Sequence, residues 1–270
     1  EAAPDAAPAA ERPVPYRGGG VRPRRIPGAG LASFALLIAL LEWGTRAGWI
    51  SALTLPRPSD VLATFGALIE SGMLWRHLLP SLARFAVGSA MGAAAGVALG
   101  LAIGLSSLAR SGLAPLIAAL FPIPKIALLP LFVIWFGIGE GSKYALIALG
   151  VFTPMAVATY GAVDNVDRTL IRMGRSFGLS RLSMIRKIVL PGALPGILSG
   201  LRVALAIGII LLVAAEMLGA THGVGAYILE AGALYDLERL FAGVAILSAM
   251  GVAVGAAVGW AERRLLAWRA

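Results

Sequence analysis

Long apolar segments alternate with short polar ones along most of this chain. A helix needs about 20 mostly apolar residues to cross the hydrocarbon core of a bilayer. Six segments meet this condition, and they cover residues 31–50, 85–105, 112–137, 144–163, 195–218 and 240–260. The third is interrupted by Pro115, Pro122, Pro124 and Pro130, which should kink or break a helix there. The pattern predicts an all-α membrane protein with six transmembrane helices.

Composition supports the membrane class and narrows the chemistry. Of 270 residues, 59% are hydrophobic and only 14% are charged, whereas about a quarter of the residues in soluble domains are charged. Cysteine is absent, which excludes disulfides and thiol catalysis, and the two histidines are far apart, so we expect no metal site. The chain has no Gly-x4-Gly-Lys-Ser/Thr phosphate loop and no recognisable catalytic set of side chains. We therefore expect a chain that is not an enzyme by itself and binds no cofactor.

The two ends differ from the apolar region between them. Residues 1–30 are rich in proline, alanine and glycine and have no apolar periodicity, which predicts a disordered tail. Residues 31–265 form the transmembrane domain, including a polar loop at about 164–194, and residues 266–270 form the C-terminal end.

Basic residues are distributed unevenly between the two sides of the predicted spans. If the N-terminus is cytoplasmic, fifteen Lys or Arg residues fall on the cytoplasmic side. They are Arg12, Arg17, Arg22, Arg24, Arg25, Arg110, Arg168, Arg172, Arg175, Arg181, Arg186, Lys187, Arg263, Arg264 and Arg269. Only Arg57, Arg76 and Lys143 fall in the outer loops. The positive-inside rule then places both termini and the 164–194 loop in the cytoplasm. The net charge of +9 therefore reflects topology in a lipid bilayer, and we expect no nucleic-acid partner.

Glycines recur every fourth residue in two of the spans. They are Gly88, Gly92, Gly96, Gly100 and Gly104 in the second span and Gly251, Gly255 and Gly259 in the sixth. Such a row lies close to one face of a helix and allows another backbone to approach closely. Packing within one subunit is the simpler interpretation, and an interface between subunits is the alternative.

The loop at 164–194 has the pattern of two short amphipathic helices that meet at Gly178. Ser180 is a candidate N-cap for the second helix, which should run from Arg181 to Val189 and end before Pro191. A basic amphipathic hairpin of this kind could simply lie on anionic headgroups.

The loop also resembles a known motif. Gly178, followed after nine residues by Ile188, Leu190 and Pro191, is similar to the Gly-x9-Ile-x-Leu-Pro core of the cytoplasmic loop in ABC importer permeases. Residues 172–174 read Arg-Met-Gly where the family pattern has Glu-Ala-Ala, so no specific ion pair is inferred there. Residues 121–163 and 214–232 resemble the branch of permeases for nitrate, aliphatic sulfonates and taurine.

This resemblance implies a type I ABC importer permease of the bacterial inner membrane. Two copies would form the pathway, two separate ATPase subunits would carry ATP and Mg, and a periplasmic binding protein would deliver substrate. The residues that would couple to the ATPase are Arg172, Arg175, Ser176, Phe177, Gly178, Leu179, Ser180, Arg181, Ile188, Leu190 and Pro191. The substrate would be a small, anionic solute such as an aliphatic sulfonate, taurine or nitrate. Alternatives are a vitamin precursor or an aromatic acid carried by the same mechanism, and, in another class, an ion-coupled secondary transporter.

Charged residues inside the spans are candidates for the pathway, because an isolated charge there is unfavourable by about 2.5–3.5 kcal/mol. The candidate pathway residues are Pro122, Pro124, Lys125, Pro130 and Glu216. Lys125 could attract an anion or pair with a carbonyl or carboxylate, and Glu216 is a gate or structural partner, with Lys125 as one possible counter-ion. Glu42 and Arg46 have the spacing of an intrahelical ion pair, and Arg202 should reach the membrane interface.

Overall fold

A computed structural model describes residues 28–51 and 54–269, and the described residues contain helices and turns but no strand. The helices are α1 Ala29–Arg46, α2 Pro58–Glu70, α3 Met73–Leu105, α4 Ser107–Leu120, η1 Lys125–Leu128, α5 Leu129–Phe136, α6 Glu140–Asp164, α7 Arg168–Ser176, α8 Arg181–Met184, the π turn η2 Ile185–Val189, α9 Leu190–Gly219, α10 Val224–Ala233, α11 Leu237–Leu265 and η3 Ala267–Arg269. The tail predicted at 1–30 lies almost wholly outside the described residues, and α1 already begins at Ala29.

The all-α fold with up to six spans is confirmed. Within the described chain, α1, α3, α6, the continuous helix from Arg181 to Gly219, and α11 are each long and apolar enough to cross a membrane. The third predicted span is two helices, α4 and η1–α5, bent by 92° at a short break that contains Pro122 and Pro124. Pro115 lies inside α4, and the helix continues past it to Leu120. The expected break therefore does not occur at this proline.

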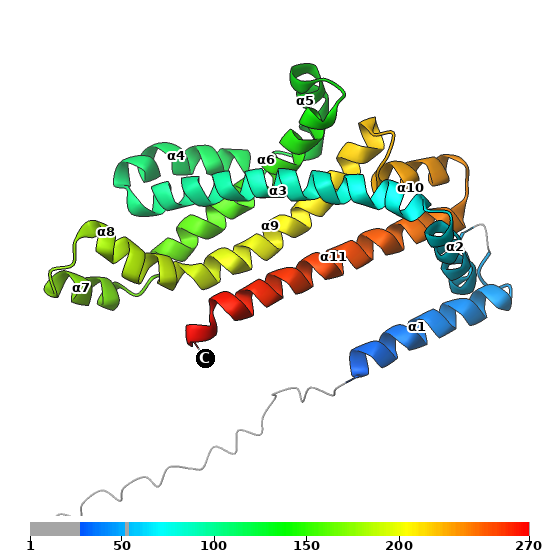
Figure 1. Cartoon of the computed structure of the whole chain (residues 1–270), viewed down its shortest axis with the longest axis horizontal. Coiled ribbons are helices and arrows are strands. Elements are labelled where there is room, and N and C mark those ends of the chain that lie inside the picture. The colour runs from blue at the N-terminus through cyan, green and yellow to red at the C-terminus, as the bar shows by residue number, and fades with distance from the viewer. Residues whose placement is uncertain (1–27, 52–53, 270) are drawn as a thin grey trace, which may run out of the picture.

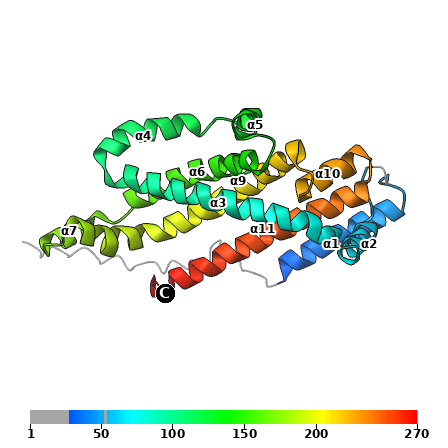
Figure 2. The same cartoon turned by 45° about the horizontal axis from the view of Figure 1, so that its top comes forward.

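The spanning helices α3, α6 and α9 lie side by side in the centre of the molecule (Figures 1 and 2). Helix α6 is the most buried of the spanning helices, and its Ile147, Val151 and Met155 are almost completely enclosed. Phe85 of α3, Leu212 of α9 and Met250 of α11 also belong to this core.

The glycine row of α3 faces α6 along its whole length. A Cβ atom at Gly88 would lie 2.7 Å from the Cβ of Ile147, and one at Gly96 would lie 2.7 Å from the carbonyl oxygen of Phe152. Comparable overlaps would occur at Gly92, Gly100 and Gly104. The two backbones approach this closely because side chains are missing at these positions.

The glycine row of α11 is different. No atom of the described chain lies within 4 Å of a Cβ built at Gly255, and only Ile209, at 3.9 Å, approaches one built at Gly251. At Gly259 the nearest atoms are guanidinium nitrogens of Arg202 and Arg263, both at 3.7 Å. Unlike the α3 row, this one is not filled by another helix of the described chain.

Helix α1 lies at the edge of the molecule and contacts it mainly through α2. The expected Glu42–Arg46 ion pair is confirmed, with Arg46 Nε 2.7 Å from Glu42 Oε1. Glu42 also accepts hydrogen bonds from the backbone N–H of Ser59 (3.0 Å) and from its hydroxyl (2.9 Å). The Glu42 carboxylate thus accepts from an N–H in the first turn of α2 that has no partner within that helix, and it links α1 to α2.

Candidate functional sites at the two ends of the bundle

The loop between α6 and α9 folds into a tight helical hairpin. Asp167 caps α7 by accepting from the backbone N–H of Thr169 at 2.7 Å, and this hydrogen bond lowers the pKa of the Asp167 carboxyl. Ser180 caps α8 by accepting from the backbone N–H of Ser183 at 3.3 Å, as the sequence predicts. Between them, Gly178 adopts a left-handed conformation with φ of 70°, which favours glycine. We call residues 168–189 the loop hairpin.

The residues expected to couple to an ATPase separate into two groups in the structure. Those around the turn are exposed except for the half-buried Leu179, and Phe177 is 80% exposed at the tip. Leu182 and Met173 add further exposed apolar surface beside it. By contrast, Ile188 packs inward, and a Cβ at Gly174 would lie 2.8 Å from its Cδ1 atom. Gly174 therefore allows the two arms of the hairpin to close on each other.

The second arm of the hairpin is continuous with a spanning helix. The sequence predicts an end before Pro191, but the chain stays helical from Arg181 to Gly219, so that boundary is wrong. The connection is the π turn, in which the Leu190 N–H bonds to the carbonyl of Ile185. In a π turn an N–H bonds to the carbonyl five residues earlier. This wider spacing accommodates Pro191, which has no N–H and whose ring would clash with a carbonyl in an α-helix. Leu190 and Pro191 are half-buried in this connection.

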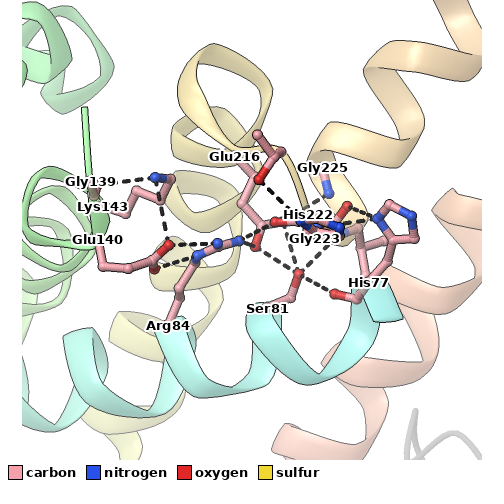
Figure 3. Close-up of polar contacts among 12 residues, drawn as sticks. His77, Ser81, Arg84, Gly139, Glu140, Lys143, Glu216, His222, Gly223 and Gly225 are labelled. Atoms are coloured by element: carbon pink, nitrogen blue, oxygen red, sulfur yellow. Dashed lines mark hydrogen bonds and ion pairs between the residues drawn. The ribbon is translucent and has the colours of Figure 1, made fainter. Parts of the chain in front are cut away.

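A buried polar cluster occupies the opposite end of the bundle, where α6 begins and α9 ends (Figure 3). Arg84 of α3 lies at its centre. Its Nε and Nη2 each donate to an oxygen of Glu140 at 2.7 Å, and its Nη1 donates to Glu216 Oε1 at 2.8 Å. Nη1 also donates to the carbonyl of His222 at 2.5 Å. Arg84 thus joins α3, α6 and α9, and through His222 the turn that leads into α10.

Glu216 is completely buried and its oxygens are fully used. Ser81 donates to Oε1 at 2.7 Å, and the backbone N–H of Gly225 donates to Oε2 at 2.8 Å. A Cβ at Gly223 would lie 2.6 Å from Oε1, so the chain passes tightly over the carboxylate. The suggested pairing with Lys125 is wrong, because Glu216 pairs with Arg84. A buried carboxylate needs such a set of donors, which favours a structural role over a freely accessible ligand.

His77 and Lys143 extend the cluster on either side. His77 Nδ1 lies 3.0 Å from the Gly223 carbonyl oxygen. Lys143 Nζ donates to the carbonyls of Ile138 and Gly139 at 3.2 and 3.0 Å and lies 3.8 Å from Glu140 Oε1. Sequence reasoning assigned no role to Arg84, Glu140 or His77. Their only signal is that Arg84, Glu140 and Glu216 all fall near the same predicted membrane boundary.

Lys125 lies at the break between α4 and α5 and is half-buried. Its Nζ donates to the carbonyl of Phe121 at 2.6 Å and lies 5.4 Å from the Phe121 ring centroid. Pro122 and Pro124 are exposed in the break, and Pro130 is in the first turn of α5. Arg202 is exposed and pairs with Glu262 at 2.9 Å. Among the described residues, no group of three or more His, Asp or Glu side chains is arranged to hold a metal ion.

Comparisons with known proteins agree with this architecture. Residues 92–267 match the model of the family described as binding-protein-dependent transport system inner membrane component. The chain is 38% identical over 240 residues to a putative aliphatic sulfonates transport permease protein of Bacillus subtilis (strain 168), covering 89% of this chain and 87% of the relative. It is also 38% identical to a taurine transport system permease protein of Escherichia coli (strain K12), covering 86% and 87%. A chain of the MetNI methionine ABC transporter in an inward-facing conformation has a TM-score of 0.62 at 22% identity, covering 71% and 95%.

Proposed function

This chain belongs to the family of binding-protein-dependent transport system inner membrane components, as a multi-pass permease subunit of an ABC importer in the bacterial inner membrane, and from that premise we propose that the loop hairpin receives the motion of a separate ATPase subunit. The chain itself would be non-catalytic, binding no cofactor, with ATP and Mg held by the ATPase.

The observation that carries this proposal is the continuous helix from Arg181 to Gly219. Its 39 residues correspond to a rod of roughly 58 Å at about 1.5 Å per residue. One end lies in the exposed hairpin beside Phe177, and the other end carries Glu216 in the buried cluster. Because the backbone is helical throughout, displacement of the hairpin would be transmitted along this helix to the far end of the bundle.

The assembly would contain two copies of this chain, two ATPase subunits and a periplasmic binding protein. The hairpin would be cytoplasmic and the polar cluster would lie at the periplasmic side, as the distribution of basic residues predicts. In Figure 1, α11 ends toward the hairpin end of the bundle, which supports placing the C-terminus on the same side as the hairpin.

The substrate we propose is a small anion of the aliphatic sulfonate, taurine or nitrate type. The names of the two relatives support this class. Lys125 supports it as well, because it is a cation at a proline break in a spanning region and has no carboxylate partner in the described chain. Broken helices of this kind are tolerated where they are buried in protein or line a water-filled cavity. A vitamin precursor or an aromatic acid carried by the same mechanism is the alternative.

Substitutions at Gly178 test the coupling role. Proline fixes φ near −65° and cannot adopt the observed 70°, so Gly178→Pro should open the hairpin and abolish substrate-stimulated ATP hydrolysis by the assembled importer. Gly178→Asn is the matched control, because asparagine tolerates the left-handed region and no atom of the described part of the chain lies within 4 Å of the new Cβ. Co-purification with the ATPase should be retained by the control. Normal stimulation in Gly178→Pro would contradict the proposal.

A further inference from the structure

A cavity lies between the loop hairpin and the ends of the spanning helices. It is a partly open cavity of about 270 Å³, bounded by α7 and α8 and by the ends of α3 and α6. Phe177, the exposed tip of the hairpin, is not part of its wall. The exposed tip therefore lies outside the cavity, although the wall includes Arg175 and Arg181, which the family resemblance places among the ATPase-coupling residues.

Three guanidinium groups line this cavity, those of Arg168, Arg175 and Arg181. Within the part of the chain that the structure describes, none of the three has an ion pair or a side-chain hydrogen bond. The carboxylate in the wall, Asp164, is already paired with Arg110. The cavity thus gathers three exposed positive charges that have no carboxylate partner in the described chain, and a bound anion would lower their mutual repulsion.

The rest of the wall is apolar. Leu105, Val163 and Ile185 face the cavity from the ends of α3 and α6 and from the π turn. A site lined by arginines and by apolar side chains suits an amphipathic anion, which has both a charged group and a hydrocarbon part. Its volume is just below the range of about 300–1,000 Å³ that is usual for small-molecule sites, which admits a headgroup but not a whole lipid.

The position of the cavity points to the same ligand class. It lies where the spanning helices α3 and α6 end, at the level of a membrane surface. Basic pockets between helices on the cytoplasmic side of membranes bind anionic headgroups, and arginine is well suited to phosphate because its donors form a planar fork. The membrane placement rests on the family assignment, and the cytoplasmic side rests on the proposed topology.

We propose that this cavity binds a phosphate group at the membrane surface, carried by an anionic phospholipid headgroup or by free phosphate, and that Arg168, Arg175 and Arg181 hold it. A phospholipid fits the apolar part of the wall, which free phosphate would leave unused. An occupied site would brace the hairpin against the ends of α3 and α6.

The binding test uses the full chain assembled with its ATPase and purified in neutral detergent. Native mass spectrometry with added phosphatidylglycerol should show one retained lipid per copy of this chain. Each basic residue near an anionic surface accounts for about a fivefold change in binding, so the triple variant R168Q/R175Q/R181Q should bind the lipid about a hundredfold more weakly. Lys187→Gln is the matched control: it removes an exposed positive charge from the same hairpin, but Lys187 does not line the cavity.

Two further arms separate the sources and the rival explanation. Inorganic phosphate at millimolar concentration should displace little of the lipid, and full displacement with phosphate bound in its place would identify free phosphate as the ligand. Equal phosphatidylglycerol retention by the parent chain and the triple variant, with no phosphate bound by either, would overturn the proposal. It would also be overturned if the triple variant lost only its ATPase and kept its lipid, because the arginines would then serve the partner. These readouts do not depend on coupling, so they remain informative if the Gly178 experiment fails.

Discussion

At the scale of single residues, Arg84 decides the stability of the polar cluster. Its side chain is only 7% exposed, and it is the cation that pairs with the completely buried Glu216. Removing one member of a buried ion pair leaves the other charged and unsolvated. The consequences should be much larger than at an exposed pair of the same chemistry.

We therefore expect Arg84→Gln to lower the free energy of unfolding by about 3–5 kcal/mol. Arg202→Gln is the control, since it breaks the exposed Arg202–Glu262 pair, and should change stability by no more than about 1 kcal/mol. Thermal or denaturant unfolding of both variants in the same detergent measures the difference. Similar losses in the two variants would show that burial of Arg84 is not what makes it important.

Lys125 tests the charge of the substrate. Lys125→Ala should weaken uptake of an anionic solute by reconstituted importer while leaving the fold intact, because within the described residues the Lys125 side chain hydrogen-bonds only to the nearby Phe121 carbonyl. Lys125→Arg keeps the positive charge and should retain more uptake than the alanine variant. If uptake in Lys125→Ala equals that of the parent, Lys125 has a structural role only.

Sequence reasoning found local residue patterns and missed distant ones. The Ser180 cap and the Glu42–Arg46 pair depend on residues within one helical turn, so spacing alone identifies them. Arg84 meets Glu140 and Glu216 across 56 and 132 positions, and only the tertiary fold brings them together. The assignment of Glu216 to Lys125 was wrong for the same reason.

At the scale of elements, the two glycine rows make opposite predictions for the same substitution. Gly92→Ala would push a Cβ into the carbonyl of Ala148 and separate α3 from α6, with an expected loss of about 1–3 kcal/mol. The Cβ of Gly255→Ala meets no atom of residues 28–51 and 54–269, so the substitution should gain up to about 1 kcal/mol of helix propensity in a single copy.

The measurement is thermal unfolding of each variant in detergent. If Gly255→Ala lost as much stability as Gly92→Ala, or weakened self-association, the α11 row would be in contact with a second copy of the chain. If Gly92→Ala left the unfolding temperature unchanged, α3 and α6 could move apart slightly without loss of stability.

The sequence predicted the long apolar elements and the two short amphipathic helices of the loop hairpin, but it missed two other short helices. The helices α2 and α10 were not expected, since 13 and 10 residues are too few to register as spans. The second span was predicted from residue 85, whereas α3 begins at Met73. Arg76, His77 and Arg84 made those first turns look like a loop, although His77 and Arg84 are buried there.

At the scale of the whole molecule, the orientation in the membrane can be tested without background labelling, because the sequence contains no cysteine. Phe177→Cys at the tip of the hairpin should react with a membrane-impermeant thiol reagent only from the cytoplasmic side. Leu234→Cys, exposed in the turn between α10 and α11, should react only from the opposite side.

Labelling of intact cells and of inverted vesicles distinguishes the two positions. The expected pattern is Leu234→Cys labelled in intact cells and Phe177→Cys labelled in inverted vesicles. The reverse pattern would place the hairpin outside the cytoplasm and remove it from reach of any cytoplasmic ATPase.

The π turn gives the hairpin helix one place where its length can change. Elsewhere along Arg181–Gly219, loss of a residue would rotate everything beyond it by about 100° and move Glu216 away from Arg84. At Ile185–Val189 the backbone already holds one residue more than an α-helical turn requires, so a deletion there would return it to α-helical bonding. A single-residue deletion engineered within these five residues should therefore be tolerated better than one elsewhere in the helix.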